Sequence, residues 1–382
     1  MCFREEDLKT SRKDRAKIRY AMVGLGHIVQ TAVLPAFVNA RRNSTLTALV
    51  SSDPLKLKKL GRKYKIEHLY SYEQYEECLH SGEIDAVYIG LPNDMHADYA
   101  IRAARAGIHV LCEKPMAVTS DECRQMIQAA RESNVKLMVA YRLHFEPANL
   151  QAVEVVQSGK IGEPRLFNSV FSYQVSDPDN IRLRRERGGG TVYDIGVYCI
   201  NAARYLFQDE PYEVFAFSAN SGDERFRDVD EMTGAILRFP RERLATFTTS
   251  FGAASVSSYR ILGTKGDLRV EPAYDYTEPL VHHLTVNQKT REKKFKLRDQ
   301  FAAELVYFSD CILNGKEPEP SGEEGWADVR VVEAIHRSSQ TGQPVRLEPF
   351  GRQERPTVEQ KVKTRRPASP RKVVNVESPH KG

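Results

Sequence analysis

The sequence predicts an α/β protein in which a doubly wound parallel sheet is followed by an α+β domain with a large, mostly antiparallel open sheet. Three observations support this prediction. Short apolar runs alternate with stretches of helical spacing through the first third of the chain, as they do in βαβ units. A glycine turn, Gly24-Leu25-Gly26, follows the first of these runs. After residue 212 the pattern changes to strand-like segments with turn residues between them.

In the first domain, the apolar runs predict strands, and the 3.6-residue spacing between them predicts helices. Pro35 is expected to kink the first helix, and Gly107 to end the third. Thr119 and Glu122 fit a capping box at the start of the fourth. The predicted strands are 18–23, 45–50, 84–91, 108–112 and 136–141, and the predicted helices are 27–40, 54–64, 94–106 and 119–133.

In the second half, helices are predicted at 147–158, 191–206, 301–313 and 327–339. Strands are predicted at 165–175, 213–219, 232–239, 244–251, 257–262, 267–271 and 282–287, with a hairpin turn at 263–266. We therefore expect an N-terminal extension at 1–17, a Rossmann domain at 18–141, a second α/β domain at 142–350, and a tail at 351–382.

The composition indicates a globular protein with basic ends. The 382 residues suffice for two domains with hydrophobic cores, and 41% of them are hydrophobic. Residues 351–382 hold nine basic and three acidic residues with few large apolar ones, which predicts a disordered tail. Such a tail could contact nucleic acid or an anionic partner, but a solvated tail is favoured, so nucleic acid is not expected.

Other features exclude further classes of protein. No apolar run approaches the roughly 18 residues that a membrane helix needs, so no membrane span is expected. Residues 1–19 lack the apolar segment of a secretory signal. The six cysteines are scattered without metal-like spacing, so we expect reduced thiols in a cytoplasmic protein, and no metal site.

The glycine turn begins an imperfect dinucleotide-binding fingerprint. Its two glycines allow a tight turn and let backbone N–H groups approach a phosphate, but Val29 stands where a third glycine is usual. An ordinary strand-to-helix turn is the alternative interpretation. Because the motif lies between a strand and a helix at the start of a βαβ series, we expect a cofactor site that includes Gly24, Leu25, Gly26, His27 and Ile28.

The end of the second predicted strand favours NADP(H) over NAD. Ser51, Ser52 and Lys56 there suit a ribose 2′-phosphate, whereas an acidic residue in contact with the ribose would repel it. Asp53 is close, but it is expected to cap the helix that starts at Pro54.

Further candidate cofactor residues follow the later strands. Leu91, Asn93 and His96 come after the third strand. The Asn93 side chain fits either a cofactor contact or a helix cap, and His96 fits either a cofactor contact or an exposed helix position. Glu113 and Lys114 end the fourth strand and Arg142 follows the fifth, where they are expected to face the same crevice.

Lys114, Asp194 and Tyr198 are the candidate catalytic residues. Hydride transfer from an alcohol requires removal of its hydroxyl proton by a suitable side chain. Lys114 could accept this proton, or could favour the ionised form of a nearby phenol. Asp194 and Tyr198 lie four residues apart on the helix after Gly188-Gly189-Gly190, so they share one helix face. From this spacing alone, a surface pair is the alternative interpretation.

Several motifs together resemble the glucose–fructose oxidoreductase / inositol dehydrogenase (Gfo/Idh/MocA) family. They are Gly24-Leu25-Gly26, Leu91-Pro92-Asn93-x-x-His96, Glu113-Lys114-Pro115-Met116, Tyr141-Arg142-x-His144 and Asp194-Ile195-Gly196-x-Tyr198. The resemblance runs from about residue 17 to residue 345. The stretches 182–186, 188–190, 223–226 and 321–325 are similar to the glucose–fructose oxidoreductase branch in particular.

This resemblance implies an NADP-dependent oxidoreductase that transfers a hydride between the nicotinamide and a sugar, polyol or sugar lactone. It implies that Lys114 orients the substrate hydroxyl, that Asp194 holds the substrate or tunes its neighbours, and that Tyr198 is the general acid and base. Arg142 and His144 would line the sugar pocket or serve the structure. The family's open sheet implies a homodimer or homotetramer.

Two alternatives stay open. NADP either stays bound through a sugar-for-sugar exchange or is exchanged in each cycle of an aldose dehydrogenase. From another class of function, the chain could be a non-catalytic protein that senses NADP(H) and binds a partner through its basic tail. The set of Lys114, Asp194 and Tyr198 argues against a sensor, because a sensor needs no proton transfer.

Overall fold

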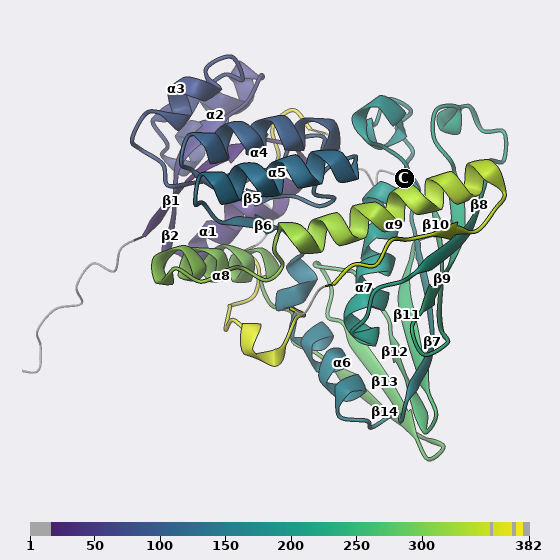
Figure 1. The fold of residues 1–382 in the computed structure, drawn as a ribbon. Coiled ribbons are helices and arrows are strands. Elements are labelled where there is room, and N and C mark those ends of the chain that lie inside the picture. Colours follow the sequence, from purple (N-terminus) through teal and green to yellow (C-terminus); the bar gives the residue numbers. More distant parts are fainter. Residues whose placement is uncertain (1–16, 352–353, 369–371, 377–382) are drawn as a thin grey trace, which may run out of the picture.

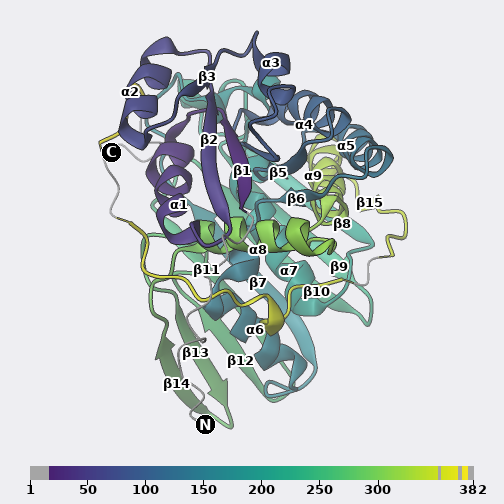
Figure 2. The ribbon, with the colours of Figure 1, turned by 90° about the vertical axis from the view of Figure 1, so that its left-hand side faces the viewer.

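The chain forms two sheets that are joined by helices, and a computed structural model describes its residues 17–351, 354–368 and 372–376. Figure 1 shows the first sheet at the upper left and the second sheet at the right, and Figure 2 shows the first sheet above the second. None of the described helices has the length and apolar character needed to cross a membrane.

The first sheet is six-stranded and parallel. Its strands are β1 (Ile18–Val23), β2 (Ser44–Val50), β3 (His68–Tyr70), β4 (Ala86–Ile89), β5 (His109–Cys112) and β6 (Leu137–Val139). Their order, β3-β2-β1-β4-β5-β6, is that of a Rossmann fold, so the predicted doubly wound sheet is confirmed. β3 was not predicted from the sequence, because it is short and only half-buried.

Helices cover both faces of this sheet. Tyr20 and Met22 of β1 belong to the core under the first group of helices, and Ala21 and Val23 to the core under the second. The first group is α1 (Leu34–Ala40), α2 (Pro54–Tyr64) and α8 (Gln300–Asn314), and the second is α3 (Tyr75–Leu79), α4 (His96–Arg105) and α5 (Ser120–Glu132).

Helix α8 covers the first sheet although it follows the second sheet in the sequence. The hydroxyl oxygens of Tyr20 and Ser44 each lie 2.8 Å from the hydroxyl oxygen of Ser309 on α8. This differs from the boundary at residue 142, which assigns the helix to the second domain. Apolar spacing predicts that a helix has a buried face, but not which sheet that face covers.

The second sheet is nine-stranded, and all of its strand pairs except β7 with β10 are antiparallel. This confirms the predicted mostly antiparallel sheet. Its strands are β7 (Pro164–Ser172), β8 (Glu213–Ala219), β9 (Met232–Phe239), β10 (Arg243–Ser250), β11 (Val256–Gly263), β12 (Gly266–Val270), β13 (Val281–Val286), β14 (Lys289–Lys294) and β15 (Val345–Arg346), in the order β14-β13-β12-β11-β7-β10-β9-β8-β15.

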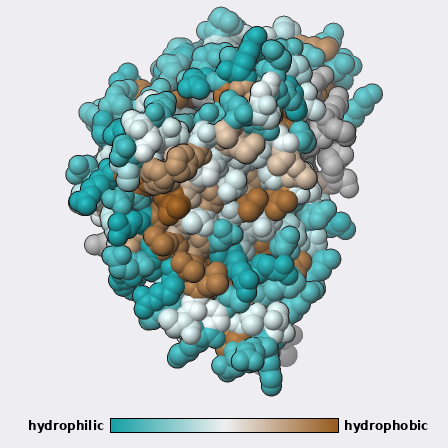
Figure 3. All heavy atoms as spheres, turned by 90° about the vertical axis from the view of Figure 1, so that its right-hand side faces the viewer, coloured by the Kyte–Doolittle hydropathy of each residue, from teal (hydrophilic) through white to brown (hydrophobic). Residues whose placement is uncertain are grey.

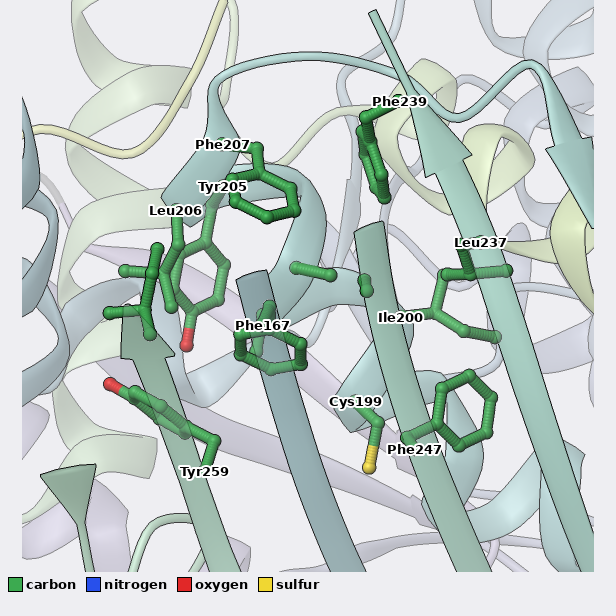
Figure 4. Close-up of a cluster of buried hydrophobic side chains, with 14 of the residues drawn as sticks. Phe167, Cys199, Ile200, Tyr205, Leu206, Phe207, Leu237, Phe239, Phe247 and Tyr259 are labelled. Atoms are coloured by element: carbon green, nitrogen blue, oxygen red, sulfur yellow. The ribbon is translucent and has the colours of Figure 1, made fainter. Parts of the chain in front are cut away.

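Three helices cover one face of the second sheet: α6 (Pro147–Gln157), α7 (Val197–Phe207) and α9 (Gly322–Thr341). Figure 4 shows the core between α7 and the strands, where Phe167 and Phe247 face Cys199 and Ile200. α9 starts five residues before its predicted start. Gly325 packs against Met116 of the first domain, because an added Cβ on Gly325 would lie only 2.7 Å from that side chain. Glycine normally disfavours a helix, so this close contact explains its presence in the first turn of α9.

Helices α1 and α7 each follow directly on a π-helical turn. Residues Val29–Val33 form the first such turn, and α1 follows with Pro35 in its own first turn. Residues Val192–Gly196 form the second, directly before α7. The predicted helices are therefore continuous, and the expected irregularity near Pro35 is the π turn that precedes it.

The described part of the tail lies against the body, which differs from the prediction of a disordered tail. Arg355 forms an ion pair of 2.7 Å with Glu210, and the Gln360 amide donates to the Glu319 carboxylate at 2.8 Å. Val362 packs against the core of the first domain. Polar contacts with the body thus replace the large apolar residues that the tail lacks. Residues 1–16 and the rest of the tail lie outside the described residues.

The buried imidazole of His282 on β13 makes folding sensitive to acid. Burial lowers the pKa of His282 to about 4 from 6.5, and Nε2 has no hydrogen-bond partner among the described residues. Between these two pH values the unfolded chain binds the proton and the folded protein does not, so stability falls as the pH decreases. We expect a loss of about 3 kcal/mol between pH 7 and pH 4 that the His282→Gln variant lacks.

This expectation is tested by urea unfolding of both proteins at several pH values. The difference between their unfolding free energies removes the contribution of all other titrating groups. A difference that stays constant from pH 7 to pH 4 would contradict the assignment.

Candidate active site

A cavity of about 450 Å³ lies where the carboxyl ends of β1, β2, β4 and β5 meet the helix start at residues 192–198. Open α/β sheets bind ligands at this edge. Its lining includes every residue predicted for the cofactor, namely Gly24, Leu25, Gly26, His27, Ile28, Ser51, Ser52, Lys56, Leu91, Asn93, His96, Glu113, Lys114 and Arg142, together with Asp194 and Tyr198.

The glycine turn fits a phosphate group. Gly24 has a φ of +88°, and an added Cβ would lie 2.6 Å from the carbonyl oxygen of Gly90. A Cβ on Gly26 would meet no protein atom closer than 4.0 Å. Gly26 therefore leaves open space beside the backbone, which a side chain would fill.

Val29 departs from the fingerprint, and Gly90 compensates for it. Val29 is fully buried, and one of its methyl carbons lies 2.5 Å from the place where a Cβ of residue 90 would be. The close approach of helix and sheet that a third glycine usually provides is thus supplied from the neighbouring strand end.

The end of β2 presents hydroxyl groups and a cation to the cavity. Ser51, Ser52 and Lys56 line it, and Asp53 does not. The Asp53 carboxylate accepts hydrogen bonds from the backbone N–H groups of Leu55 at 2.8 Å and Lys56 at 3.1 Å, which confirms that it caps α2. These groups fit a 2′-phosphate better than a free 2′-hydroxyl.

Asn93 and His96 join loops at the edge of the cavity. The Asn93 amide donates to the Gly188 carbonyl at 2.8 Å and caps no helix. His96 is fully buried, so an exposed helix position is wrong. Its ring nitrogens lie 2.9 Å and 3.0 Å from the carbonyl oxygens of Pro115 and Leu91. Sequence reasoning missed these roles because all three partners are backbone carbonyl groups, which no side-chain pattern reports.

Lys114 from the first domain meets Asp194 and Tyr198 from the second. Lys114 Nζ donates to the Asp194 backbone carbonyl at 2.7 Å and lies 3.4 Å from its carboxylate. The same nitrogen lies 4.8 Å from the centre of the Tyr198 ring. Burial opposes the charge on Lys114, but Tyr198 and Asp194 outweigh it and raise the pKa of Lys114. Lys114 is therefore a cation at neutral pH.

Asp194 is held as a carboxylate by three groups. Its Oδ2 atom accepts hydrogen bonds from Tyr173 at 2.5 Å and from Arg182 at 2.9 Å. Burial favours the protonated form, but Arg182 and Lys114 outweigh it and hold the pKa of Asp194 well below its usual range. A fixed negative charge therefore lies beside the Lys114 ammonium.

Arg142 is the second cation near Tyr198. Its guanidinium donates to the Tyr198 hydroxyl at 3.3 Å, to the Tyr274 carbonyl at 2.6 Å and to Gln300 at 2.6 Å. The phenol oxygen of Tyr198 is thus flanked by Arg142, with Lys114 over its ring.

His144 does not line the cavity, which corrects its assignment to the substrate site. It is buried, and its two ring nitrogens lie 3.1 Å from the Glu319 carboxylate and 2.7 Å from Asn201. Arg142 and His144 share the 3₁₀ turn Arg142–Phe145. Residues two apart on such a turn point in different directions, so only the first reaches the cavity.

Sequence reasoning missed Tyr173, Arg182 and Tyr276 as cavity residues. Arg182 belongs to the stretch that resembles the glucose–fructose oxidoreductase branch, which was the available signal. Tyr173 follows β7, where alternation predicts only that one of two neighbours is buried. Among the described residues, no group of three or more His, Cys, Asp or Glu side chains is placed to hold a metal ion.

Comparison with known proteins identifies the two halves of the chain. The oxidoreductase family with an NAD-binding Rossmann fold, GFO/IDH/MocA, matches residues 18–141, and the GFO/IDH/MocA C-terminal domain matches residues 149–269. An NADP(+) D-xylose 1-dehydrogenase from Haloarcula marismortui is 36% identical over 338 residues, which cover 87% of this chain and 93% of that protein.

Solved structures agree with these matches. The aldose-aldose oxidoreductase from Caulobacter crescentus, complexed with glycerol, is 37% identical with a TM-score of 0.83, and the match covers 87% of this chain and 100% of that one. A 3-ketoreductase from Actinomadura kijaniata, in complex with NADP and TDP-benzene, is 29% identical with a TM-score of 0.77, over 84% and 98% of the two chains. The chain therefore belongs to the GFO/IDH/MocA oxidoreductase family.

Proposed function

We propose that this chain is an NADP-dependent oxidoreductase that transfers a hydride between the nicotinamide and a sugar or sugar lactone. The observation that carries the proposal is the meeting of Lys114 and Tyr198 across the cavity, 4.8 Å from nitrogen to ring centre. It brings a cation and a phenol from the two domains to one space. The glycine turn and the end of β2 supply the nucleotide half of that space.

The cofactor supplies the hydride or accepts it, and the chain supplies the proton transfer. Tyr198 is the proposed acid and base, because it lines the cavity, its hydroxyl accepts a hydrogen bond from Arg142, and the Lys114 ammonium lies over its ring. Lys114 is proposed to orient the reacting hydroxyl group. Asp194 keeps Lys114 charged and in place.

Relatives support NADP and a sugar as the ligands. The Haloarcula protein is named for D-xylose and NADP(+), and the Caulobacter protein for aldoses. The Caulobacter structure also contains glycerol, a polyol. In this chain Ser52 and Lys56 fit the 2′-phosphate of NADP, and Tyr173 and Arg182 add polar groups for sugar hydroxyls. A glucose–fructose oxidoreductase-like exchange and an aldose dehydrogenase are the two forms of this activity.

The proposal is tested by incubating the protein with a panel of aldoses and NADP⁺ or NAD⁺. Absorbance at 340 nm follows NADPH, and product analysis detects a sugar-for-sugar exchange that leaves the absorbance unchanged. We expect lactone formation with NADP⁺ and little with NAD⁺. Binding of NADPH without any sugar product, in every pairing of aldoses, would contradict the activity.

The outer face of the second sheet supports assembly of this chain with copies of itself. Five apolar side chains there are between 38% and 64% exposed: Leu166, Phe217, Ile236, Leu244 and Val256. Figure 3 shows apolar side chains gathered on this face. Leu166 and Leu244 are register partners, so the patch crosses adjacent strands. An apolar patch of this kind marks a protein interface.

We therefore expect the Phe217→Asp variant to have a lower molar mass than the wild type in light scattering, because a buried carboxylate opposes the interface. Leu313→Asp is the matched control, since Leu313 is an exposed apolar residue on α8 instead. Equal masses for wild type and Phe217→Asp would contradict this interface.

The cysteines support a cytoplasmic location. The five cysteines among the described residues are unpaired and buried. Reduced thiols are usual in the cytoplasm.

A further inference from the structure

Residues 372–376, here called the strap, lie beside the nucleotide end of the cavity. The strap contacts α2 and the helical turn after the glycine turn, and Figure 2 shows this yellow end of the chain beside α2. The backbone N–H of Val374 donates to the Gln30 side chain at 2.7 Å, and the Gln30 amide donates to the Val374 carbonyl at 2.9 Å. This pairing resembles the pairing of two strands.

Gln30 joins the strap to the glycine turn. Its side chain is 1% exposed, and the same amide nitrogen that contacts Val374 also donates to the Leu25 carbonyl at 2.8 Å. Leu25 lies between the two glycines and lines the cavity. A displacement of the strap therefore removes one of the partners that fix the Gln30 amide beneath the turn.

A second contact joins the strap to the end of β2. The Asn375 amide donates to Asp53 Oδ2 at 2.6 Å, while Asp53 Oδ1 accepts from the backbone of Leu55 and Lys56. The hydrogen bond from Asn375 lowers the pKa of Asp53. The carboxylate beside Ser52 and Lys56 is therefore engaged on both of its oxygens, away from the cavity.

Neighbouring contacts hold the chain before the strap against the same domain. The backbone N–H of Asp299 donates to the Arg365 carbonyl at 2.9 Å, and the Asn39 amide donates to the Arg366 carbonyl at 3.2 Å. Val374 itself packs against the core of the first domain. The described chain on either side of residues 369–371 thus contacts the same domain.

The strap lies beyond the two matched family domains. The solved Caulobacter chain is matched over its full length by 87% of this chain, and the two family domains match residues 18–141 and 149–269. The strap lies outside both of these matched ranges. Its contacts therefore belong to neither of the two matched family domains.

We propose that the strap completes the NADP site and slows release of the nucleotide by holding the glycine turn and the end of β2 together. This inference rests on the proposed function, because it takes the glycine turn as the pyrophosphate site and Ser51 to Lys56 as the 2′-phosphate site. Release of a dinucleotide requires both loops to move away from its phosphates. The strap bonds to Asp53 after β2 directly and to the glycine turn through Gln30, so its hydrogen bonds oppose that motion.

The experiment measures the rate of NADPH release from the full chain by stopped-flow fluorescence, with excess NADP⁺ as the competitor. Val374→Pro removes the N–H group that bonds Gln30, and Asn375→Ala removes the bond to Asp53. We expect each variant to release NADPH several times faster, and a chain that ends at residue 371 about ten times faster.

Two controls separate this effect from general damage. Val373→Pro introduces the same residue one position earlier, at an N–H group that makes no hydrogen bond among the described contacts. A chain that ends at residue 376 keeps the whole strap. Both should release NADPH at the wild-type rate. Thermal unfolding without nucleotide checks that the variants are folded, and the two point variants remain informative if the shortened chain is not.

The outcomes distinguish the two proposals. Equal release rates for wild type, Val374→Pro and Asn375→Ala would overturn the role of the strap and leave the proposed function intact. Faster release from both variants, with no turnover of any sugar, would support the strap and contradict the proposed function. A full chain that binds no NADPH would contradict both.

Discussion

The Tyr198→Phe variant is expected to lose turnover by about a thousandfold while it keeps its affinity for NADPH. General acid–base catalysis contributes roughly 10²- to 10⁴-fold, and this substitution removes the group to which we assign it. The Phe ring keeps the contacts of the Tyr198 ring with Phe171 and Tyr274, at 5.6 Å and 5.8 Å between ring centres. The loss therefore falls on kcat rather than on folding.

Tyr193→Phe is the matched control for this variant. Tyr193 lies on the same π turn as Asp194, but its hydroxyl donates to the Val118 carbonyl at 2.7 Å. The Tyr193→Phe variant tests whether the turn tolerates removal of a phenol oxygen, and its turnover should stay close to that of the wild type. If Tyr198→Phe keeps more than about a tenth of the wild-type kcat, the proton transfer belongs to another group.

The fold was predictable because its signals are local. Apolar runs and helical spacing are properties of neighbouring residues, so most strands and helices were found within a few residues of their ends. The missed elements lack such signals: β14 (Lys289–Lys294) is exposed throughout and has no large apolar residue, and β15 has two residues. The start of α9 was hidden because glycines there serve a contact with Met116.

The site was predictable as a set of motifs but not as a network. The sequence placed Lys114, Asp194 and Tyr198 together through a family resemblance, whereas Tyr173 reaches Asp194 from just after β7 and Arg182 from the 3₁₀ turn Ile181–Leu183. These contacts between distant segments depend on the tertiary structure, and neither helical nor strand periodicity in the sequence predicts them. The close contact of Val29 with Gly90 was missed for the same reason, because it joins a helical turn to the end of a different strand.

His144 shows the opposite error. The family resemblance implied a place for it in the sugar pocket, with a structural role as the alternative. The turn directs it instead into a buried polar cluster with Glu319 and Asn201. Adjacent members of one motif can therefore serve the site and the core separately.

The Lys114→Met variant is expected to lower kcat by about 10²- to 10³-fold, the usual cost of removing one preorganised charged donor from an active site. Methionine keeps the length of the side chain and removes its charge. Asp194 stays paired with Arg182 at 2.9 Å and Tyr173 at 2.5 Å, so no unpaired buried carboxylate remains. Steady-state kinetics with the aldose that the panel identifies, together with NADPH binding, measures the effect.

Lys56→Met supplies the contrast that makes this result specific. Lys56 lines the same cavity at the end of β2, beside Ser51 and Ser52. Its loss should weaken binding of NADPH, leave binding of NADH unchanged and preserve kcat at saturating cofactor. Lys114→Met should show the reverse, because its ammonium lies at Asp194 and Tyr198 rather than at the phosphate. If both variants instead lose cofactor affinity and keep kcat, Lys114 is a nucleotide ligand and the proposed division of the cavity is wrong.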